Sequence, residues 1–499
     1  MKKNIYILLI SLFSTVFAAA QTTAEALLFS QNIYEGTARF QGMGGAFAAL
    51  GGDFTTLSIN PAGVAVFRSS EFSFTPELAF LSTSGNYLNN QSSEPKARAG
   101  LGNFGWISAF DTHNSSGVVG VNFGIGFNKL QNNPQRFSAS GRTGNTSLPA
   151  ALAMGLSNDG VSHNTFDNDA TNTEWLAMRT KLISYVENRD GSYIGATENF
   201  DAADPDDLSK IYQMGDVNQS YYCDQSGYVG EYVFNFGLNV SHLFYFGMTF
   251  GLQDVQNDFY EEYLEAAVNY ADFDTTGYRG LGHETNIRTS GVGYNLKFGA
   301  IVRPVGGLRL GAYIHTPTWM SLRNTWNERM TSDVGGAKYD EFIDGHDDYR
   351  LTTPMRWGMG IAYTFGSVAL LSVDYEGVNY RHTRLANENG VTSAYRDANE
   401  RLQNDNRTTA NIRIGGEYKI NDFAIRAGYA WYQNARKNFA DTQVGSVGFG
   451  YRGRFVSVDA AYSFAPGVKE NYVLYNGSPY ETSLNIFISK LAVTVGFRF

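Results

Sequence analysis

The chain has 499 residues, of which 43% are hydrophobic, 14% aromatic and only 17% charged, whereas an average soluble domain carries roughly 25% charged residues. The aromatic content excludes intrinsic disorder, and the formal net charge of -10 argues against a nucleic-acid partner. Beyond residue 20, no apolar run reaches the roughly 18 residues that a spanning helix needs, which excludes a helical membrane protein. The only cysteine, Cys223, excludes a disulfide scaffold.

Residues 1–20 have the pattern of a secretory signal peptide. Lys2 and Lys3 precede an apolar stretch from Ile5 to Phe17, and three alanines then lead to Gln21. We expect cleavage at this A-x-A site, so that the exported chain starts at Gln21. No cysteine follows the apolar stretch, so we expect no lipid anchor.

Residues 21–68 lack strand alternation and are rich in glycine. We expect short helical pieces at Ala24–Phe29 and Ala46–Leu50. The clustered glycines allow backbones to approach closely in a confined space. We interpret this segment as a compact plug that precedes the first strand.

From about residue 70 to the end, apolar and polar residues alternate, which places successive side chains on opposite faces of strands. The last segment shows the pattern most clearly, because one of its faces consists of Leu491, Val493, Val495, Phe497 and Phe499. Soluble sandwiches alternate as well, so the connections between strands have to decide the architecture.

Short and long connections alternate strictly along the chain. The short ones lie near residues 111–117, 241–244, 304–307, 366–367, 421–422 and 452–454. The long ones lie near residues 84–98, 133–227, 261–284, 332–348, 385–405, 437–441 and 467–483. An even strand number with long loops at one end is typical of a bacterial outer-membrane barrel. We therefore predict an all-β fold, a 14-stranded antiparallel transmembrane β-barrel over residues 69–499, with residues 21–68 as an N-terminal hatch in its lumen.

The predicted extracellular loop at residues 133–227 is too long to be a bare connection. We expect one helix that starts after Ser147 with Pro149 in its first turn, and another from about Thr173 to Glu187. The second carries an apolar stripe at helical spacing, formed by Trp175, Met178, Leu182 and Val186. The stripe could seat the helix on the rest of the loop or form an apolar groove that captures ligands.

No motif indicates a cofactor, a metal or an enzyme. The acidic cluster of Asp201, Asp204, Asp206 and Asp207 lacks the spacing of a calcium loop and is interpreted as a solvated turn. The seven histidines include no H-x-x-x-H pair. Serine, histidine and aspartate are all present, but no spacing singles out a catalytic triad.

The hatch segment resembles the FadL/TodX family of outer-membrane channels for long-chain fatty acids and other hydrophobic compounds. The resemblance rests on the run from Ala38 to Phe47, on Asp53, and on Asn60-Pro61-Ala62 just before the first strand. It implies a hatch whose gating residues are Arg39, Gly42, Gly44, Gly45, Asp53, Asn60, Pro61 and Ala62. It also implies that ligand collected among the extracellular loops enters the lumen, shifts the hatch and leaves sideways into the bilayer beside a kinked third strand.

Two other functions remain open. Gly63 and the long loop after the third strand resemble homologues from the Bacteroidetes, and some relatives there serve type IX protein secretion as carriers or shuttles. A general diffusion porin is the third reading, which residues 21–68 disfavour because they would obstruct flow.

Candidates for the lateral exit lie in the first and third strands. The third strand, Val118–Asn128, carries Gly120, Gly124 and Gly126 on its inner face, where they could permit a kink or simply make room for the hatch. Pro76 in the first strand removes a ladder donor and suggests a bulge or a local gap.

Inward-facing cations could meet a charged ligand head group. They are Lys297, Arg356, Arg413 and Arg426, and each could instead pair with an acidic residue such as Glu417, Asp374 or Asp459 on a neighbouring strand. The expected partners of the protein are hydrophobic small molecules, outer-membrane lipid and the barrel-assembly machinery, for which the terminal Phe497 and Phe499 would be the signal. We expect a monomer without cofactor.

Overall fold

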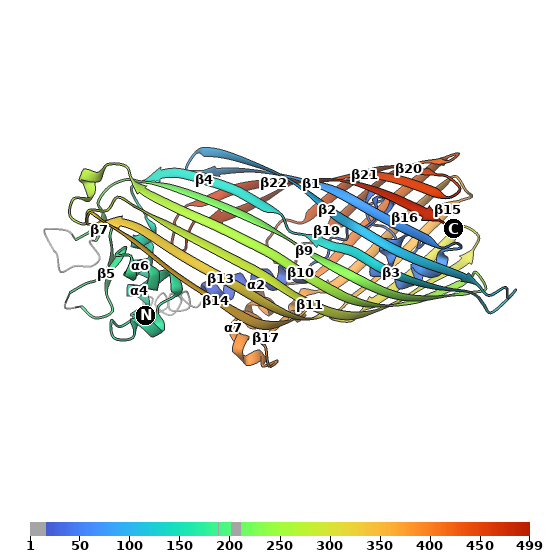
Figure 1. The fold of residues 1–499 in the computed structure, drawn as a ribbon, viewed down its shortest axis with the longest axis horizontal. Helices are drawn as coiled ribbons and strands as arrows, with labels where there is room; N and C mark the ends of the chain where they lie inside the picture. Colours follow the sequence, from blue (N-terminus) through green and yellow to red (C-terminus); the bar gives the residue numbers. More distant parts are fainter. Residues whose placement is uncertain (1–15, 188, 201–210) are drawn as a thin grey trace, which may run out of the picture.

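Most strands of the computed structural model form one closed sheet. The structure describes residues 16–187, 189–200 and 211–499, so most of the expected signal peptide and the cluster of Asp201, Asp204, Asp206 and Asp207 lie outside the described residues. The first strand, β1 (Glu71–Tyr87), pairs with β2 (Asn90–Asp111) on one side and with the last strand, β22 (Glu481–Arg498), on the other. The ladder therefore returns to its start (Figure 1).

The barrel wall has the predicted fourteen strands. Three of them are interrupted and continue along the same neighbours: β3 (Val118–Asn132) into β4 (Gln135–Thr143), β12 (Leu308–His315) into β13 (Trp319–Val334), and β14 (Ala337–Thr352) into β15 (Arg356–Phe365). The uninterrupted ones are β9 (Val217–Val240), β10 (Phe244–Ala267), β11 (Gly280–Val305), β16 (Ala369–Asn379), β18 (Thr408–Ile420), β19 (Phe423–Tyr432), β20 (Thr442–Arg452) and β21 (Val456–Val473), besides β1, β2 and β22. A short strand, β17 (Arg384–Asn387), pairs only with the end of β14.

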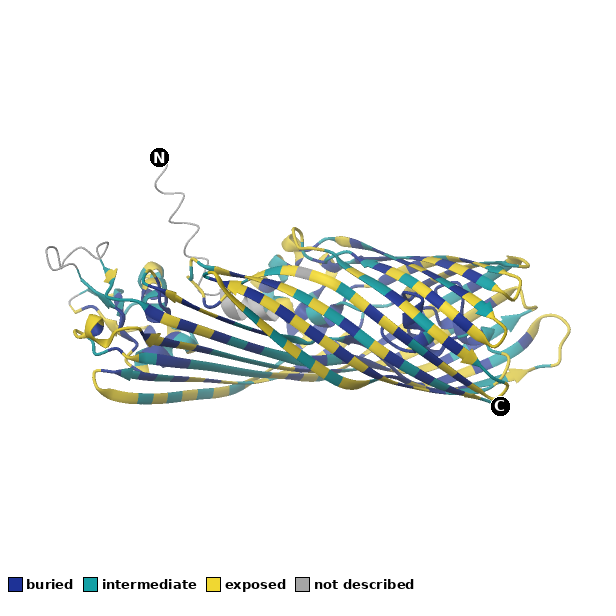
Figure 2. Cartoon of the chain, turned by 90° about the horizontal axis from the view of Figure 1, so that it is seen from above, coloured by how far each residue is buried: buried dark blue, intermediate teal, exposed yellow. Residues whose placement is uncertain are grey.

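The outer face of the wall is apolar over a belt of membrane height. On β10, the exposed outward side chains are Phe244, Phe246, Met248, Phe250 and Leu252. Inward positions on the same strand are buried, which produces the alternating pattern in Figure 2. A closed ladder with an apolar exterior satisfies every backbone group in lipid, so the barrel is a bacterial outer-membrane fold. Among the helices of the described residues, none combines the length and apolarity that crossing a membrane requires.

All six predicted short turns are present, but two of the predicted long loops are wrong. Residues 84–98 and 332–348 are continuous hairpin arms, joined by tight turns at Leu88-Asn89 and Gly335-Gly336. All four turn residues have positive φ, which two-residue hairpin turns require. These arms rise above the apolar belt, where both faces meet water or polar groups, so their sequence loses the alternation that marks a strand.

Helices of the long loop lie at the end of the barrel opposite to the C-terminus (Figure 1). They are α4 (Leu148–Asp159), α5 (Phe166–Asp169) and α6 (Asn172–Arg179), and the small sheets of β5 (Ile183–Tyr185) with β6 (Tyr193–Gly195) and β7 (Glu198–Asn199) with β8 (Tyr212–Gln213) lie beside them. The Ser147 side chain caps α4 as predicted, accepting from the Ala150 amide. We call residues 144–216 the cap. Its core packs on inward side chains of the wall such as Phe137 and Tyr221.

The predicted apolar stripe does not form a helical groove. The helix α6 ends at Arg179, because Lys181 adopts a left-handed backbone conformation. Leu182 and Val186 therefore lie beyond the helix and are buried, while Trp175 and Met178 are partly buried against the same core. Trp175, Met178 and Leu182 belong to the core that seats the cap on the barrel, in line with the alternative interpretation of the stripe, whereas Val186 lies outside this core.

The remaining helices belong to the N-terminal segment and to the loops: α2 (Val16–Ser30), α3 (Ala38–Gly42), η1 (Phe54–Ser58), η2 (Pro61–Val66), η4 (Tyr270–Phe273), η5 (Tyr380–His382), η6 (Thr392–Tyr395) and α7 (Arg396–Asp405). The helix predicted at Ala46–Leu50 is absent. There the Ala48 amide donates to Asp374 of β16 and its carbonyl accepts from Asn60, so the backbone bonds to other groups instead of its own helix.

Candidate functional site

Of the predicted hatch, residues 21–68, the part from residue 37 to residue 67 fills the lumen at the short-turn end of the barrel, and we keep the name hatch for this part. Thr37 and Asp53 hold its two halves together, since the Thr37 hydroxyl donates to both Asp53 carboxylate oxygens at 2.8 and 2.7 Å. Thr37 also caps α3, and Asp53 caps η1. Short polar side chains at such positions satisfy helix N–H groups that no internal carbonyl reaches.

Asn60 connects the hatch to the wall. Its Oδ1 caps η2 by accepting from the Ala62 amide at 3.1 Å, and its Nδ2 donates to the carbonyls of Ala48 at 2.6 Å and Ala300 of β11 at 3.3 Å. Pro61 occupies the first helical position, where its missing N–H costs nothing. The Asn60-Pro61-Ala62 triplet is fully buried. The structure thus gives each of the three a structural role at the hatch–wall contact.

Replacing Asn60 by alanine should loosen this contact while the barrel still assembles. The change removes a cap and two donated hydrogen bonds, and we expect a loss of about 2 kcal/mol in the stability of the hatch. Protease sensitivity of the hatch in folded, heat-modifiable barrel would report it. If Asn60→Ala abolishes heat-modifiable folding, Asn60 serves barrel assembly instead.

Charged side chains anchor the hatch as well. Arg39 donates to Glu417 of β18 at 3.0 Å and to the Gly52 carbonyl at 3.2 Å. Lys297 of β11 donates to the Ser58 carbonyl at 2.9 Å and pairs with Glu231 at 2.5 Å. These contacts tie the hatch to two different strands of the wall, β11 and β18.

The four inward cations are all buried and paired with carboxylates. Besides Lys297, they are Arg356 with Glu376 at 3.5 Å, Arg413 with Glu376 at 3.8 Å, and Arg426 with Glu417 at 2.6 Å and Asp459 at 2.7 Å. Their charges are therefore balanced within the wall. This arrangement matches the pairing alternative and leaves little reason to assign them to a ligand head group.

Glycines on both sides let the hatch backbone touch the wall. A Cβ on Gly44, whose φ is +60°, would lie 2.6 Å from the Tyr429 nitrogen of β19. On the wall side, a Cβ on Gly428 would lie 2.0 Å from the Gly44 nitrogen. Gly42 packs on Gly448 of β20, and Gly45 has a positive φ and faces Phe40 and Arg413. At Gly44 and Gly428, a side chain would fit only if the facing backbone moved.

Two glycines of the third strand, Gly124 and Gly126, make room for the hatch. A Cβ on Gly124 would lie 2.4 Å from Leu57, and one on Gly126 would lie 2.7 Å from Phe54. Gly120, Gly124 and Gly126 have ladder partners in both β2 and β9. The pairing of β3 with β9 shifts register between Val118 and Gly120 but keeps its pairs at Gly124 and Gly126. An exit at these three glycines stays a prediction, and the room that Gly124 and Gly126 make for Leu57 and Phe54 matches the alternative interpretation.

The ladder between β2 and β3 stops just beyond them. Its last pair is Asn103 with Asn128, whereas β2 continues to Asn90 with pairs to β1 alone. The pairing of β3 with β9 shifts register between Lys129 and Gln131. The bulge expected at Pro76 is present, since the pairing of β1 with β2 shifts between Thr75 and Pro76. We call the unpaired stretch between residues 98–102 of β2 and residues 129–132 of β3 the window.

A cavity of about 310 Å³ occupies the window. Phe104 and Tyr232, both exposed on the lipid face, line its outer side, and Glu77 and Lys129, both buried, line its inner side. Arg98 and Asn132 complete its polar rim. No backbone ladder joins β2 to β3 here, although β2 keeps its pairs with β1 and β3 keeps its pairs with β9.

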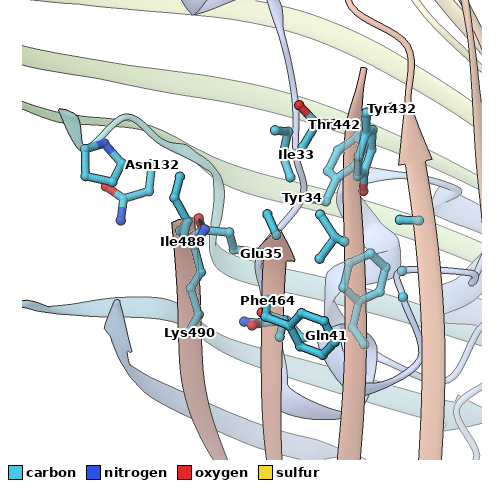
Figure 3. A pocket seen from close by; sticks show the side chains of 18 residues that line it. Ile33, Tyr34, Glu35, Gln41, Asn132, Tyr432, Thr442, Phe464, Ile488 and Lys490 are labelled. Atoms are coloured by element: carbon cyan, nitrogen blue, oxygen red, sulfur yellow. Dashed lines mark hydrogen bonds and ion pairs between the residues drawn. The ribbon is translucent and has the colours of Figure 1, made fainter. Parts of the chain in front are cut away.

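A second cavity, of about 120 Å³, lies above the hatch, and we call it the inner cavity (Figure 3). Tyr34 and Glu35 of the strap, residues 31–36 between α2 and α3, form one side of it. Hatch residues from Phe40 to Gly45 and the β3–β4 junction at Asn132 and Pro134 form two further sides. The last wall strands contribute mostly apolar side chains: Ala430, Tyr432, Thr442, Val444, Ser463, Phe464, Ala465, Ile488 and Lys490. Phe464 is also exposed on the outer face of the wall. Its pair with Gly445 is the last one of the ladder between β20 and β21, so the cavity reaches the surface of the wall at this point.

Four charged residues at these cavities were not predicted from the sequence as site residues: Glu35, Glu77, Lys129 and Lys490. The available signal was a charged residue at an inward position of a strand whose outward positions are apolar, as at Glu77 between Phe74 and Phe80. Within the described ranges, His, Cys, Asp and Glu side chains form no group of three that could hold a metal ion.

No family model and no curated protein matches the sequence. The structure does resemble solved barrels. The crystal structure of a Pseudomonas aeruginosa FadL homologue gives a TM-score of 0.55 at 13% identity, covering 93% of this chain and 98% of that chain. The crystal structure of the P. putida toluene transporter TodX gives a TM-score of 0.53 at 13% identity, with coverages of 93% and 99%. The comparison shows a FadL-like fold, a 14-stranded barrel with an N-terminal segment.

Proposed function

We propose that the protein is an outer-membrane channel for passive uptake of hydrophobic compounds. The proposal is carried by the apolar inner cavity against the hatch and by the nearby cavity in the window, where the ladder between β2 and β3 has ended. A plugged lumen does not suit ions or sugars. A path that ends in the wall suits molecules that gain about 0.8 kcal/mol for each CH₂ that reaches lipid instead of water.

The proposed path follows the openings in order. A hydrophobic molecule collected at the long-loop end enters the inner cavity, and movement of the hatch connects this cavity to the window. The molecule then leaves sideways past Phe104 and Tyr232 into the bilayer. In this scheme, Asp53 and Asn60 act as hinges and anchors of the hatch, and Arg39 holds it closed.

The size of the inner cavity favours small cargo. Its volume of about 120 Å³ is close to the ~150 Å³ of a cavity that binds benzene and below the roughly 300 Å³ from which pockets for larger ligands begin. We therefore favour single-ring aromatics and short alkyl compounds over the long-chain fatty acids that the sequence resemblance suggests. A long acyl chain would have to occupy both cavities at once. The transport of toluene by TodX is in keeping with this size.

Uptake of two labelled compounds by cells with and without the gene tests the proposal. We expect several-fold faster uptake of toluene with the gene, and a smaller difference for oleic acid. Equal uptake of both compounds by both cell types would defeat the channel. If the gene instead changes the set of secreted proteins, a role as a type IX secretion carrier is the better interpretation. That alternative rests on the resemblance of Gly63 and the long loop to homologues from the Bacteroidetes.

A further inference from the structure

The inner cavity and the window cavity are neighbours, separated by four charged side chains. Glu35 and Lys490 line the inner cavity, Glu77 and Lys129 line the window cavity, and Asn132 lines both. We call the four charged residues the partition. They come from the strap, β22, β1 and β3, so the partition joins the hatch segment to three strands of the wall.

Opposite charges meet directly within the partition. Lys490 Nζ donates to Glu35 Oε1, and Lys129 Nζ donates to Glu77 Oε1. Lys129 Nζ also lies 3.8 Å from Glu35 Oε2, so Glu35 faces both lysines. The side chains are at most 16% exposed. Removing one member would leave a buried charge unpaired, so the closed arrangement depends on all four side chains.

The strap also replaces the backbone partner that β3 has lost. The Glu35 amide donates to the Lys129 carbonyl at 3.2 Å, just beyond the last pair of the ladder between β2 and β3. A buried carbonyl at an unpaired edge needs such a partner. The position of the strap and the closure of the window therefore depend on the same residue.

Two glycines of β2 face the partition. On β2, Gly100 and Gly102 face the partition without side chains, and a Cβ on Gly100 would lie 2.8 Å from Lys129 Nζ. A Cβ on Gly102 would lie 2.9 Å from Glu77 Oε2 and from the Gly36 carbonyl of the strap. An apolar molecule cannot pass while the paired charges fill this space, because it would have to separate them in a low-dielectric site.

We propose that Glu35 is the gating residue that couples the hatch to the window. Movement of the strap withdraws Glu35 from Lys490 and from Lys129, and this movement joins the inner cavity to the window cavity. The inference rests on the proposed function, because it assigns a residue to the step between entry and lateral exit.

Neutralising Glu35 should weaken the closed state. In Glu35→Gln, the amide keeps the shape of the side chain and loses the attraction to both lysines, so we expect toluene uptake to rise about five-fold through a larger open population. Glu71→Gln is the matched control, because Glu71 lies on the same strand as Glu77 and pairs with Arg498 at 2.9 Å, away from both cavities. Uptake by Glu35→Gln at or below the wild-type rate would overturn the gating role.

A reversible cross-link tests the same role in barrels that are already assembled. Glu35→Cys with Lys129→Cys, in a Cys223→Ser background that removes the native thiol, places two cysteines where the backbones already share a hydrogen bond. We expect oxidation to reduce toluene uptake to that of cells without the gene and reduction to restore it. Ser457→Cys with Gly496→Cys, paired residues within the wall, is the control that oxidation should leave unchanged.

The outcomes separate the two proposals. Equal uptake by wild-type cells and cells without the gene defeats the channel function. If wild-type cells take up toluene faster than cells without the gene, but oxidation of the variant with cysteines at positions 35 and 129 leaves its uptake unchanged, only the gating role of Glu35 is defeated. Heat-modifiable migration of each variant confirms that a loss of uptake does not come from failed assembly.

Discussion

Deleting residues 21–66 should raise the single-channel conductance of the barrel in planar bilayers on the order of ten-fold, because a lumen of this strand number lies between filled small barrels and open porins of 16–18 strands. The hatch fills that lumen with side chains that are fully buried against the wall, such as Phe47, Leu57 and Val64. The glycines that receive the hatch would then line an open path.

Loss of the hatch also removes partners from buried charges. Lys297 loses the Ser58 carbonyl and Glu417 loses Arg39, so the deleted barrel should be less stable although its ladder is untouched. Heat-modifiable migration shows whether it still assembles. If the full-length barrel already conducts as well as the deleted one, the protein is a general diffusion porin and the hatch reading fails.

The membrane-height part of the wall could be predicted from sequence because one face of each strand meets lipid. In β22, the apolar face read from Leu491 to Phe499 is the outer face of the structure. Above the belt this constraint disappears. Residues 84–98 are strand on both sides of a tight turn, but water and polar partners on both faces permit a sequence that resembles a loop.

Local motifs of the hatch were readable for a similar reason. Asn60 and Asp53 cap helices that begin within a few residues of them, so their surroundings are encoded nearby. The partition is not local, since Glu35 meets Lys490 across nearly the whole chain. Alternation places Lys490 and Glu77 inside the barrel, yet it cannot state which carboxylate meets which ammonium or where the ladder between β2 and β3 ends.

Glycines posed an ambiguity that sequence alone could not resolve. A missing side chain at Gly124 is equally compatible with a kink and with a neighbour that fills the space. The structure decides for the neighbour, because Leu57 occupies the position of the missing Cβ. The same reasoning identifies which wall glycines the hatch requires, and it can be tested at two adjacent residues of β18.

Gly415→Val should expel the hatch, whereas Gly416→Val should not. A Cβ on the inward Gly415 would lie 2.2 Å from the Met43 carbonyl of the hatch backbone, which cannot move without the rest of the hatch. A Cβ on Gly416 would meet the flexible end of Leu371 at 3.1 Å. Overpacking of this kind costs about 1–3 kcal/mol or more, so we expect Gly415→Val to show the raised conductance of the deleted barrel and Gly416→Val to remain closed.

Combining the substitution with the deletion distinguishes displacement of the hatch from damage to the wall. If valine at position 415 acts by expelling the hatch, it should add nothing to the conductance of a barrel that lacks residues 21–66. A further change in the double variant would place its effect in the wall itself. Equal conductance of Gly415→Val and wild type would mean that the hatch does not press on β18 as the contact between Gly415 and Met43 requires.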